Sequence, residues 1–111
     1  MIGKYKVISI IGSTRFKNEI EHAAARLTLD GYIVFPLTVF TKADQLTLND
    51  NQLEMLSDMV RKKIDISDEV YVVNSRGYIG SSTRQEIKYA LDNNKKVTFS
   101  NNNINLGDLN I

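Results

Sequence analysis

Four short runs of mostly apolar residues are spaced along the chain, and each is typical of a β-strand. They are Lys6 to Ile11, Tyr32 to Phe35, Glu69 to Val73 and Lys96 to Ser100. The first run reads Lys-Val-Ile-Ser-Ile-Ile. Its near-continuous β-branched character is typical of a strand covered on both faces, as in a parallel sheet.

Apolar residues recur at helical spacing between these runs and predict three helices. The first runs from about Phe16 to Asp30, with Gly31 as its stop signal. The second begins near Asn49, where Gln52 is the expected capping partner. Its apolar stripe consists of Leu53, Leu56, Val60 and Ile64. The third follows the loop 74–82 and stops at about Asn93 and Asn94.

Alternation of strands and helices predicts an α/β fold with a parallel sheet and right-handed crossovers. We expect a small flavodoxin-like (Rossmann-like) three-layer α/β/α domain over residues 1–100, with four or five strands. The tail, residues 101–111, adds an edge strand, docks on a neighbour or is disordered. The connection from Leu37 to Leu48 has no clear period, and loops this long are often functional.

Composition narrows the range of functions. The chain has 111 residues, 14 basic and 13 acidic, so bulk charge gives no reason to expect nucleic-acid or membrane binding. The absence of cysteine and the single histidine, His22, exclude thiolate and multi-histidine metal sites. No apolar run approaches the ~20 residues of a membrane span, and the first residues lack signal-peptide features. We therefore expect a cytoplasmic protein without a metal or other cofactor.

The loop after the first strand contains Gly12, Ser13, Thr14 and Arg15. Glycine lets the backbone approach a ligand closely. A helix start offers free N–H groups and a partial positive charge, to which Arg15 adds a full one. The loop therefore predicts contact with a phosphate or a sugar hydroxyl, although plain N-capping by Ser13 or Thr14 explains it equally well.

A similar loop follows the third strand and contains Tyr78, Gly80, Ser81 and Ser82. Tyr78 either stacks on a base or packs on its own domain. In parallel sheets, ligands bind beyond the carboxyl ends of the strands, where the strand order reverses. We therefore expect the two loops to form one site.

Two carboxylates near these loops have both a chemical and a structural interpretation. Glu86 can attack a sugar carbon or act as a general base. The spacing Thr83-x-x-Glu86 also matches a capping box, which is the more frequent meaning of this pattern. Asp65 ends the second helix and either contacts a ligand or forms a salt bridge with Arg61 or Lys62.

Three motifs together resemble those of the nucleoside 2-deoxyribosyltransferase superfamily, which includes the 2′-deoxynucleoside 5′-phosphate N-hydrolases. The motifs are Ile10 to Arg15, Ser67 to Val73, and Ile79-Gly80 through Glu86 to Ala90. The resemblance covers about Lys6 to Ser100 and is strongest in the third motif. It is closest to a small branch with the signatures Gly-Ser-Thr-Arg-Phe and Gly-Tyr-Ile-Gly-x-Ser-Thr.

The resemblance implies that Glu86 is a nucleophile that forms a glycosyl-enzyme at the anomeric carbon. It also implies contacts to the sugar or 5′-phosphate from Gly12, Ser13, Arg15, Ser81 and Ser82, and assembly as a homodimer or larger homo-oligomer. The chain departs from the family at Val60, which stands where an aspartate is expected about eight residues before Asp68.

The sequence therefore favours two functional hypotheses, an enzyme and a binding module. The first is an enzyme that cleaves or transfers the N-glycosidic bond of a 2′-deoxynucleoside or its 5′-monophosphate, with Glu86 as nucleophile and Asp65 as candidate acid. Carboxylates alone can stabilise such an oxocarbenium-like centre. The second is a non-catalytic nucleotide-binding or sensor module, which Val60 favours. An accessory protein that acts through protein contacts is a weaker third.

Overall fold

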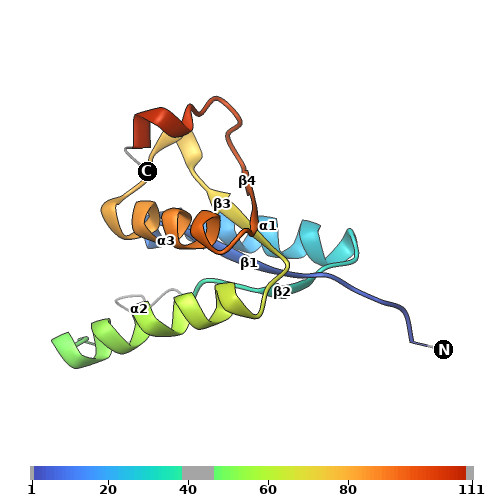
Figure 1. Ribbon diagram of the computed structural model, residues 1–111, viewed down its shortest axis with the longest axis horizontal. Coiled ribbons are helices and arrows are strands. Elements are labelled where there is room, and N and C mark those ends of the chain that lie inside the picture. The colour runs from blue at the N-terminus through green and yellow to red at the C-terminus, as the bar shows by residue number, and fades with distance from the viewer. Residues whose placement is uncertain (1, 39–46, 110–111) are drawn as a thin grey trace.

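The computed structural model describes residues 2–38 and 47–109 and has a four-stranded, all-parallel sheet with the order β2-β1-β3-β4 (Figure 1). The strands are β1 (Val7–Gly12), β2 (Ile33–Phe35), β3 (Glu69–Val73) and β4 (Lys96–Phe99). The pairing of β1 with β3 runs from Ile8 opposite Glu69 to Gly12 opposite Val73. The predicted small α/β flavodoxin-like fold is confirmed.

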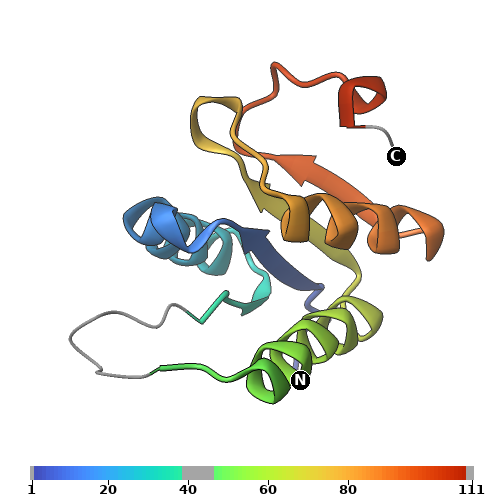
Figure 2. The same cartoon turned by 90° about the vertical axis from the view of Figure 1, so that its left-hand side faces the viewer.

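In the part of the chain that the structure describes, three α-helices cover the sheet from both sides. They are α1 (Lys17–Leu29), α2 (Asp50–Asp65) and α3 (Ser81–Asp92). Figure 2 shows α1 on one face and both α2 and α3 on the other. Right-handed crossovers require this arrangement, because the chain moves outward from β1 to β2 and then back past β1 to β3 and β4.

The two central strands supply one core on each face of the sheet. Ile10 and Tyr71 pack with α1, whereas Ile11, Val70 and Val72 pack with α2 and α3. Successive side chains of a strand point to opposite faces, so a continuous apolar run serves both cores. Every residue of β3 is buried for this reason.

The helix boundaries follow the predicted signals. Asn49 and Gln52 form the expected capping box, in which the Asn49 side chain accepts from the Gln52 N–H at 2.8 Å and the Gln52 side chain accepts from the Asn49 N–H at 3.0 Å. α1 is followed by Gly31 at φ +99°, and α3 by Asn94 at φ +60°. Both residues adopt the left-handed conformation that commonly ends a helix.

The tail docks on its own domain over the part that the structure describes. Fully buried Asn74 holds its start, because the Asn74 side chain accepts from the Asn101 N–H at 2.8 Å and donates to the Asn101 carbonyl at 3.0 Å. Ile104 and Leu109 then pack against the core that α2 and α3 cover. The tail contains a short 3₁₀ turn, η4 (Leu106–Leu109), in place of an edge strand.

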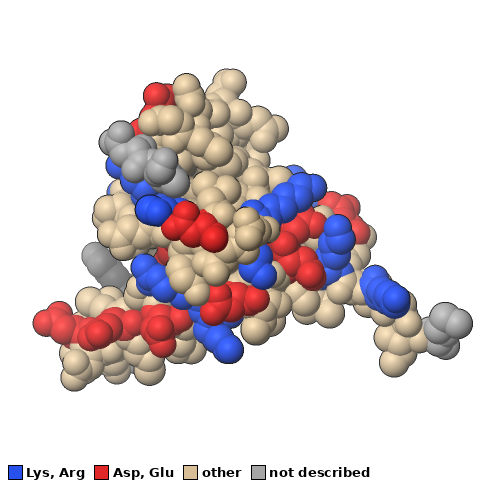
Figure 3. Space-filling model, viewed as in Figure 1, with Lys and Arg blue, Asp and Glu red and all other residues tan. Residues whose placement is uncertain are grey.

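The predicted connection between β2 and α2 lies largely outside the described residues, which omit 39–46. Within the described parts, no helix combines the length and apolar character needed to cross a bilayer. Acidic and basic side chains are interspersed over the face drawn in Figure 3. This mixed surface agrees with the near-zero net charge of the sequence.

Candidate functional site

A pocket of about 510 Å³ opens between α2, α3 and the loops that leave the carboxyl ends of β1 and β2. Its volume falls within the ~300–1,000 Å³ that is usual for small-molecule sites. Its lining consists of Thr14, Leu37, Thr38, Leu48, Leu53, Leu56, Ser57, Met59, Val60, Lys63, Ser82 and Glu86. The pocket lies at the carboxyl ends of the strands, the edge of the sheet where ligand sites of parallel α/β folds occur.

Glu86 is the carboxylate of this lining, and it does not cap its own helix. α3 begins at Ser81 with Gly80 as the N-cap, and no side chain caps this helix start. Glu86 is therefore the sixth helical residue, too far along to reach the first turn, and the capping-box interpretation of Thr83 and Glu86 is wrong. No described residue forms a hydrogen bond with the Glu86 carboxylate, although the side chain is buried.

Burial changes the acidity of this group. Removal from water penalises the charged form and raises the pKa of Glu86 to about 7, while the positive charge of Arg61 opposes part of the rise. Near neutral pH the group is thus divided between a proton-bearing acid and a carboxylate. Such a group can exchange a proton or act as a nucleophile.

Two hydroxyl side chains from the predicted loops reach the same pocket. Thr14 comes from η1 (Thr14–Phe16), the turn after β1, and Ser82 comes from the first turn of α3. The two loops therefore share one pocket with Glu86. Ser81 is exposed and lies outside the lining.

The sequence did not reveal the contribution of α2. Leu53, Leu56 and Met59 form an apolar wall of the pocket, and both Leu53 and Met59 are about half exposed. Lys63 adds a cation whose Nζ donates to the Pro36 carbonyl at 3.4 Å. Leu53 and Leu56 belong to the predicted apolar stripe of this helix, but their spacing does not show whether a given turn packs on the sheet or lines a pocket.

Gly12 and Ser13 have structural roles. Gly12 ends β1 so close to β3 that a Cβ atom would lie 2.7 Å from the Val73 carbonyl oxygen. The glycine is thus required by the neighbouring strand. Ser13 is the N-cap of η1, and its Oγ accepts from the Arg15 N–H at 3.3 Å. This is the capping alternative that the sequence left open.

Arg15 and Tyr78 contact each other and link the two loops. The Arg15 guanidinium lies 3.9 Å from the centroid of the Tyr78 ring, and its Nη2 donates to the Tyr78 hydroxyl at 3.2 Å. Phe16 packs edge-on against the same ring at 6.0 Å. In this structure Tyr78 packs on its own domain, and the Arg15 guanidinium covers a face of its ring on which a base would stack.

Asp65 is not brought to the pocket. It ends α2 beside the amino ends of the strands, because each connecting helix runs antiparallel to them. Its carboxylate accepts a hydrogen bond from the Tyr89 hydroxyl at 2.6 Å. This hydrogen bond is the largest cause of the raised pKa of Tyr89. Among the described residues Asp65 forms no ion pair with Arg61 or Lys62.

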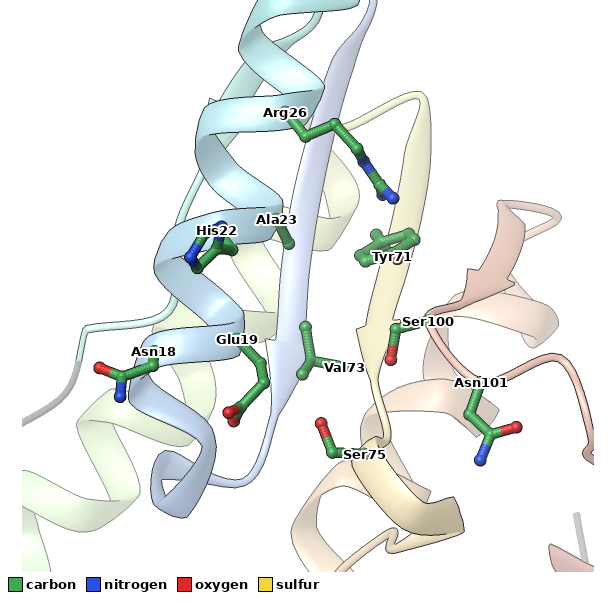
Figure 4. A pocket seen from close by; sticks show the side chains of 10 residues that line it. All are labelled: Asn18, Glu19, His22, Ala23, Arg26, Tyr71, Val73, Ser75, Ser100 and Asn101. Carbon is green, nitrogen blue, oxygen red and sulfur yellow. The ribbon is translucent and has the colours of Figure 1, made fainter.

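A second, larger hollow of about 800 Å³ lies on the opposite face of the sheet, beside α1 (Figure 4). Glu19, His22 and Arg26 of α1 line one side, and Arg26 reaches over the Tyr71 ring, 5.3 Å from its centroid. It holds none of the predicted site residues. We refer to it below as the α1 trough.

No metal centre is assembled in residues 2–38 and 47–109, where no three carboxylate or imidazole side chains gather to hold an ion. Comparison with known proteins gave no family model, no curated protein and no solved structure that matches the chain. The assignment of a function therefore depends on the pocket itself and on the sequence motifs.

Proposed function

We propose that the pocket between α2 and α3 binds a 2′-deoxynucleoside or its 5′-monophosphate and that Glu86 cleaves or transfers the N-glycosidic bond. The main support is the position of Glu86: a buried carboxyl group lines a pocket of suitable size, has no capping role and accepts no hydrogen bond from a described residue. A carboxylate without a structural partner is a candidate for chemistry.

The chemistry needs no group beyond the substrate, water and the pocket. Deprotonated Glu86 attacks the anomeric carbon, and the base leaves with the electron pair of the C–N bond and gains a proton from water. Water, or a second base, then displaces Glu86 from the sugar and restores the carboxylate. Leu53, Leu56 and Met59 offer apolar contact to the base, while Thr14 and Ser82 offer hydrogen bonds to the sugar or its phosphate.

The test is incubation with each deoxynucleoside and its 5′-monophosphate, followed by chromatography for free base. We expect base release that Glu86→Gln abolishes and that Glu54→Gln, an exposed change on α2, leaves intact. Because a nucleophile must be deprotonated, the rate should rise with pH through about 7. Base release that survives Glu86→Gln would rule out the proposed role.

A binding module without catalysis is the second candidate. Glu86 is the one carboxylate in the pocket lining that the structure describes, whereas glycosidases use two. Val60, at the position where the resemblance expects an acid, also lines the pocket and contributes only apolar surface. This candidate predicts that nucleotides raise the melting temperature while no base is released.

The proposal extends to location and assembly. We propose a cytoplasmic protein that works as a homodimer or larger homo-oligomer. The small size of the domain supports self-association, since a short chain buries a small share of its own surface. The α1 trough supports it too, because the described residues leave this part of the sheet without a covering helix.

A further inference from the structure

The pocket between α2 and α3 borders a polar pair that the proposed chemistry at Glu86 does not use. Ser57 and Arg61 lie one turn apart on α2, and Ser57 lines the pocket. Leu53 and Val60 line it too, and each is one turn from Ser57, so these side chains share one face of the helix. Because Ser57 is exposed, a ligand in the pocket can reach its hydroxyl.

The Arg61 guanidinium constrains how the Ser57 hydroxyl forms hydrogen bonds. Its Nη1 donates to the Ser57 Oγ at 2.5 Å and to the Ser57 carbonyl at 3.2 Å. The Oγ thus accepts from a cation, and its own proton points elsewhere. Among the described residues no acceptor receives this proton, which leaves it available to a ligand. A hydroxyl that accepts a charge-assisted hydrogen bond is a stronger donor, because linked hydrogen bonds polarise one another.

Arg61 also contacts α3, one turn beyond Glu86. Its Cζ lies 5.9 Å from the centroid of the Tyr89 ring, and Tyr89 is three residues after Glu86. Arg61 forms no ion pair with another described residue, so no carboxylate there neutralises its charge. Burial raises the pKa of Glu86 and the charge of Arg61 opposes this rise, which agrees with a guanidinium close to the pocket. A positive charge therefore lies behind the Ser57 hydroxyl.

Release of the base is the step that such a donor would assist. When the C–N bond breaks, its electron pair stays on the base, which is negatively charged until water protonates it. A donor already in place stabilises this charge without reorganisation. Ser57 is suitably positioned on α2, because it adjoins Leu53, whose side chain offers apolar contact to the base.

We infer that Ser57 donates a hydrogen bond to the departing base and that Arg61 is the positioning residue that strengthens this donor. Ser57 keeps its proton throughout, so bonds and charges balance as in the reaction at Glu86. The role rests on the proposed function, since it assigns a contact within the same pocket and reaction. Thr14 and Ser82 remain available to the sugar or its phosphate.

The first experiment measures binding in a full-length Glu86→Gln background, where turnover does not interfere. Calorimetry compares the four 2′-deoxynucleoside 5′-monophosphates with 2-deoxyribose 5-phosphate, which has no base. We expect Ser57→Ala to weaken binding of the nucleotides about three- to tenfold, the value of one neutral hydrogen bond. Binding of 2-deoxyribose 5-phosphate should not change. Ser57→Thr keeps a hydroxyl and should restore most of the nucleotide affinity.

The second experiment measures kcat/KM with Glu86 intact, for 2′-deoxyguanosine 5′-monophosphate and its N7-methyl derivative. The methylated base leaves without negative charge and needs no donor. Ser57→Ala should lower kcat/KM at least about tenfold for the unmethylated substrate and less than about threefold for the methylated one. Arg61→Met should show the same dependence on the leaving base, which a merely structural role would not produce. Lys62→Met removes an equal charge at an exposed position of α2 and should alter neither value.

The two experiments separate failure of this role from failure of the proposed function. If no base is released but Ser57→Ala weakens nucleotides selectively, the reaction at Glu86 is excluded while the contact of Ser57 with the base stands. Equal effects of Ser57→Ala on nucleotides and on 2-deoxyribose 5-phosphate, no effect on either, or no binding of any of these ligands would overturn the inference. Equal losses of kcat/KM for the two guanine substrates would overturn it as well.

Discussion

At the scale of single residues, the carboxyl group of Glu86 couples the pocket to the stability of the fold. Burial raises its pKa from 4.5 to about 7. Between these values the folded chain holds a proton that the unfolded chain has lost, so the free energy of unfolding falls as pH rises across this window. The loss is complete above the folded pKa and amounts to about 3 kcal/mol.

Glu86→Gln removes this titration while preserving shape. Relative to the wild type, we expect the variant to gain about 3 kcal/mol of unfolding free energy between about pH 4 and about pH 8. Urea denaturation at a series of pH values measures the difference. Glu54→Gln, at an exposed position, serves as control and should show a flat difference. A flat difference for Glu86→Gln would mean that the carboxyl group is solvated.

Gly12 offers a second prediction at this scale. Alanine at this position places a Cβ atom 2.7 Å from the Val73 carbonyl oxygen, on a backbone with φ +154°. We expect Gly12→Ala to lower the free energy of unfolding by at least about 2 kcal/mol, because the central strands must separate. Gly31→Ala is the control, since its Cβ meets nothing within 4 Å and it costs only the strain of φ +99°. Equal losses in denaturation experiments would contradict the steric explanation.

Sequence spacing could not decide what Glu86 does. The pattern Thr83-x-x-Glu86 fits a capping box only if Thr83 is the N-cap, whereas the N-cap of α3 is Gly80. The residue at which α3 begins depends on the path of the chain from the end of β3. That path is set by the packing of β3 in the sheet, and the sequence around Glu86 does not determine it.

At the scale of elements, the contact of Arg15 and Phe16 with Tyr78 joins the turn after β1 to the loop after β3. Tyr78 is 40 % exposed, so each interaction is weak by itself. Two lining residues of the pocket are nevertheless close to this contact, because Thr14 lies in the same turn as Arg15 and Ser82 begins the helix that follows the loop of Tyr78. The contact therefore limits how far the loop edges of the pocket can move apart.

Tyr78→Ala tests this link. We expect a loss of about 1 kcal/mol in the free energy of unfolding, since a cation–π contact and an aromatic pair are removed at the surface. Amide hydrogen exchange at Thr14, Arg15 and Phe16 should accelerate by more than the decrease in the free energy of unfolding accounts for. Tyr78→Phe keeps the ring and loses only the hydroxyl bond to Arg15, so it should fall between wild type and alanine. Unchanged exchange in Tyr78→Ala would show that the loops are held separately.

The elements themselves were largely predictable, because strand and helix periods are local properties of the sequence. The four strands, three helices and the Asn49–Gln52 cap all appear where the patterns placed them. Which residues of the apolar stripe on α2 enter the core and which line the pocket was not predictable. Ile64 enters the core, whereas Leu53 lines the pocket. Both are apolar residues on one stripe, and only the distance of each helix turn from the sheet separates their roles.

At the scale of the whole molecule, strand alternation and crossover handedness predicted the parallel sheet and the edge at which the loops gather. They also explain why Asp65 lies apart from Glu86. Both α2 and α3 run antiparallel to the strands, so the C-terminal end of α2 lies at the opposite edge of the sheet from the N-terminal end of α3. The pocket that Glu86 lines and the α1 trough depend on how side chains pack between elements that are distant in sequence. The periodicity of apolar residues within one element does not predict such cavities.

At the α1 trough no helix formed by the described residues covers the sheet, although parallel sheets are usually covered on both faces. Glu19 and Arg26 line it on one side of α1, seven residues and about 10 Å apart along the helix. Neither forms an ion pair with another described residue. A second copy of α1, packed antiparallel across a two-fold axis, would bring Glu19 to Arg26 of the partner subunit, twice by symmetry.

Charge reversal tests this mode of assembly by sedimentation across a range of protein concentrations. Glu19→Arg places like charges opposite each other at both contacts, so we expect the dimer to dissociate at least about tenfold more readily. The double variant Glu19→Arg/Arg26→Glu exchanges the two charges and should restore association, which a merely structural role of either residue would not produce. Glu21→Arg, an exposed change outside the trough, controls for net charge. A wild-type monomer at every concentration, or a double variant no better than the single, would exclude the antiparallel α1 contact.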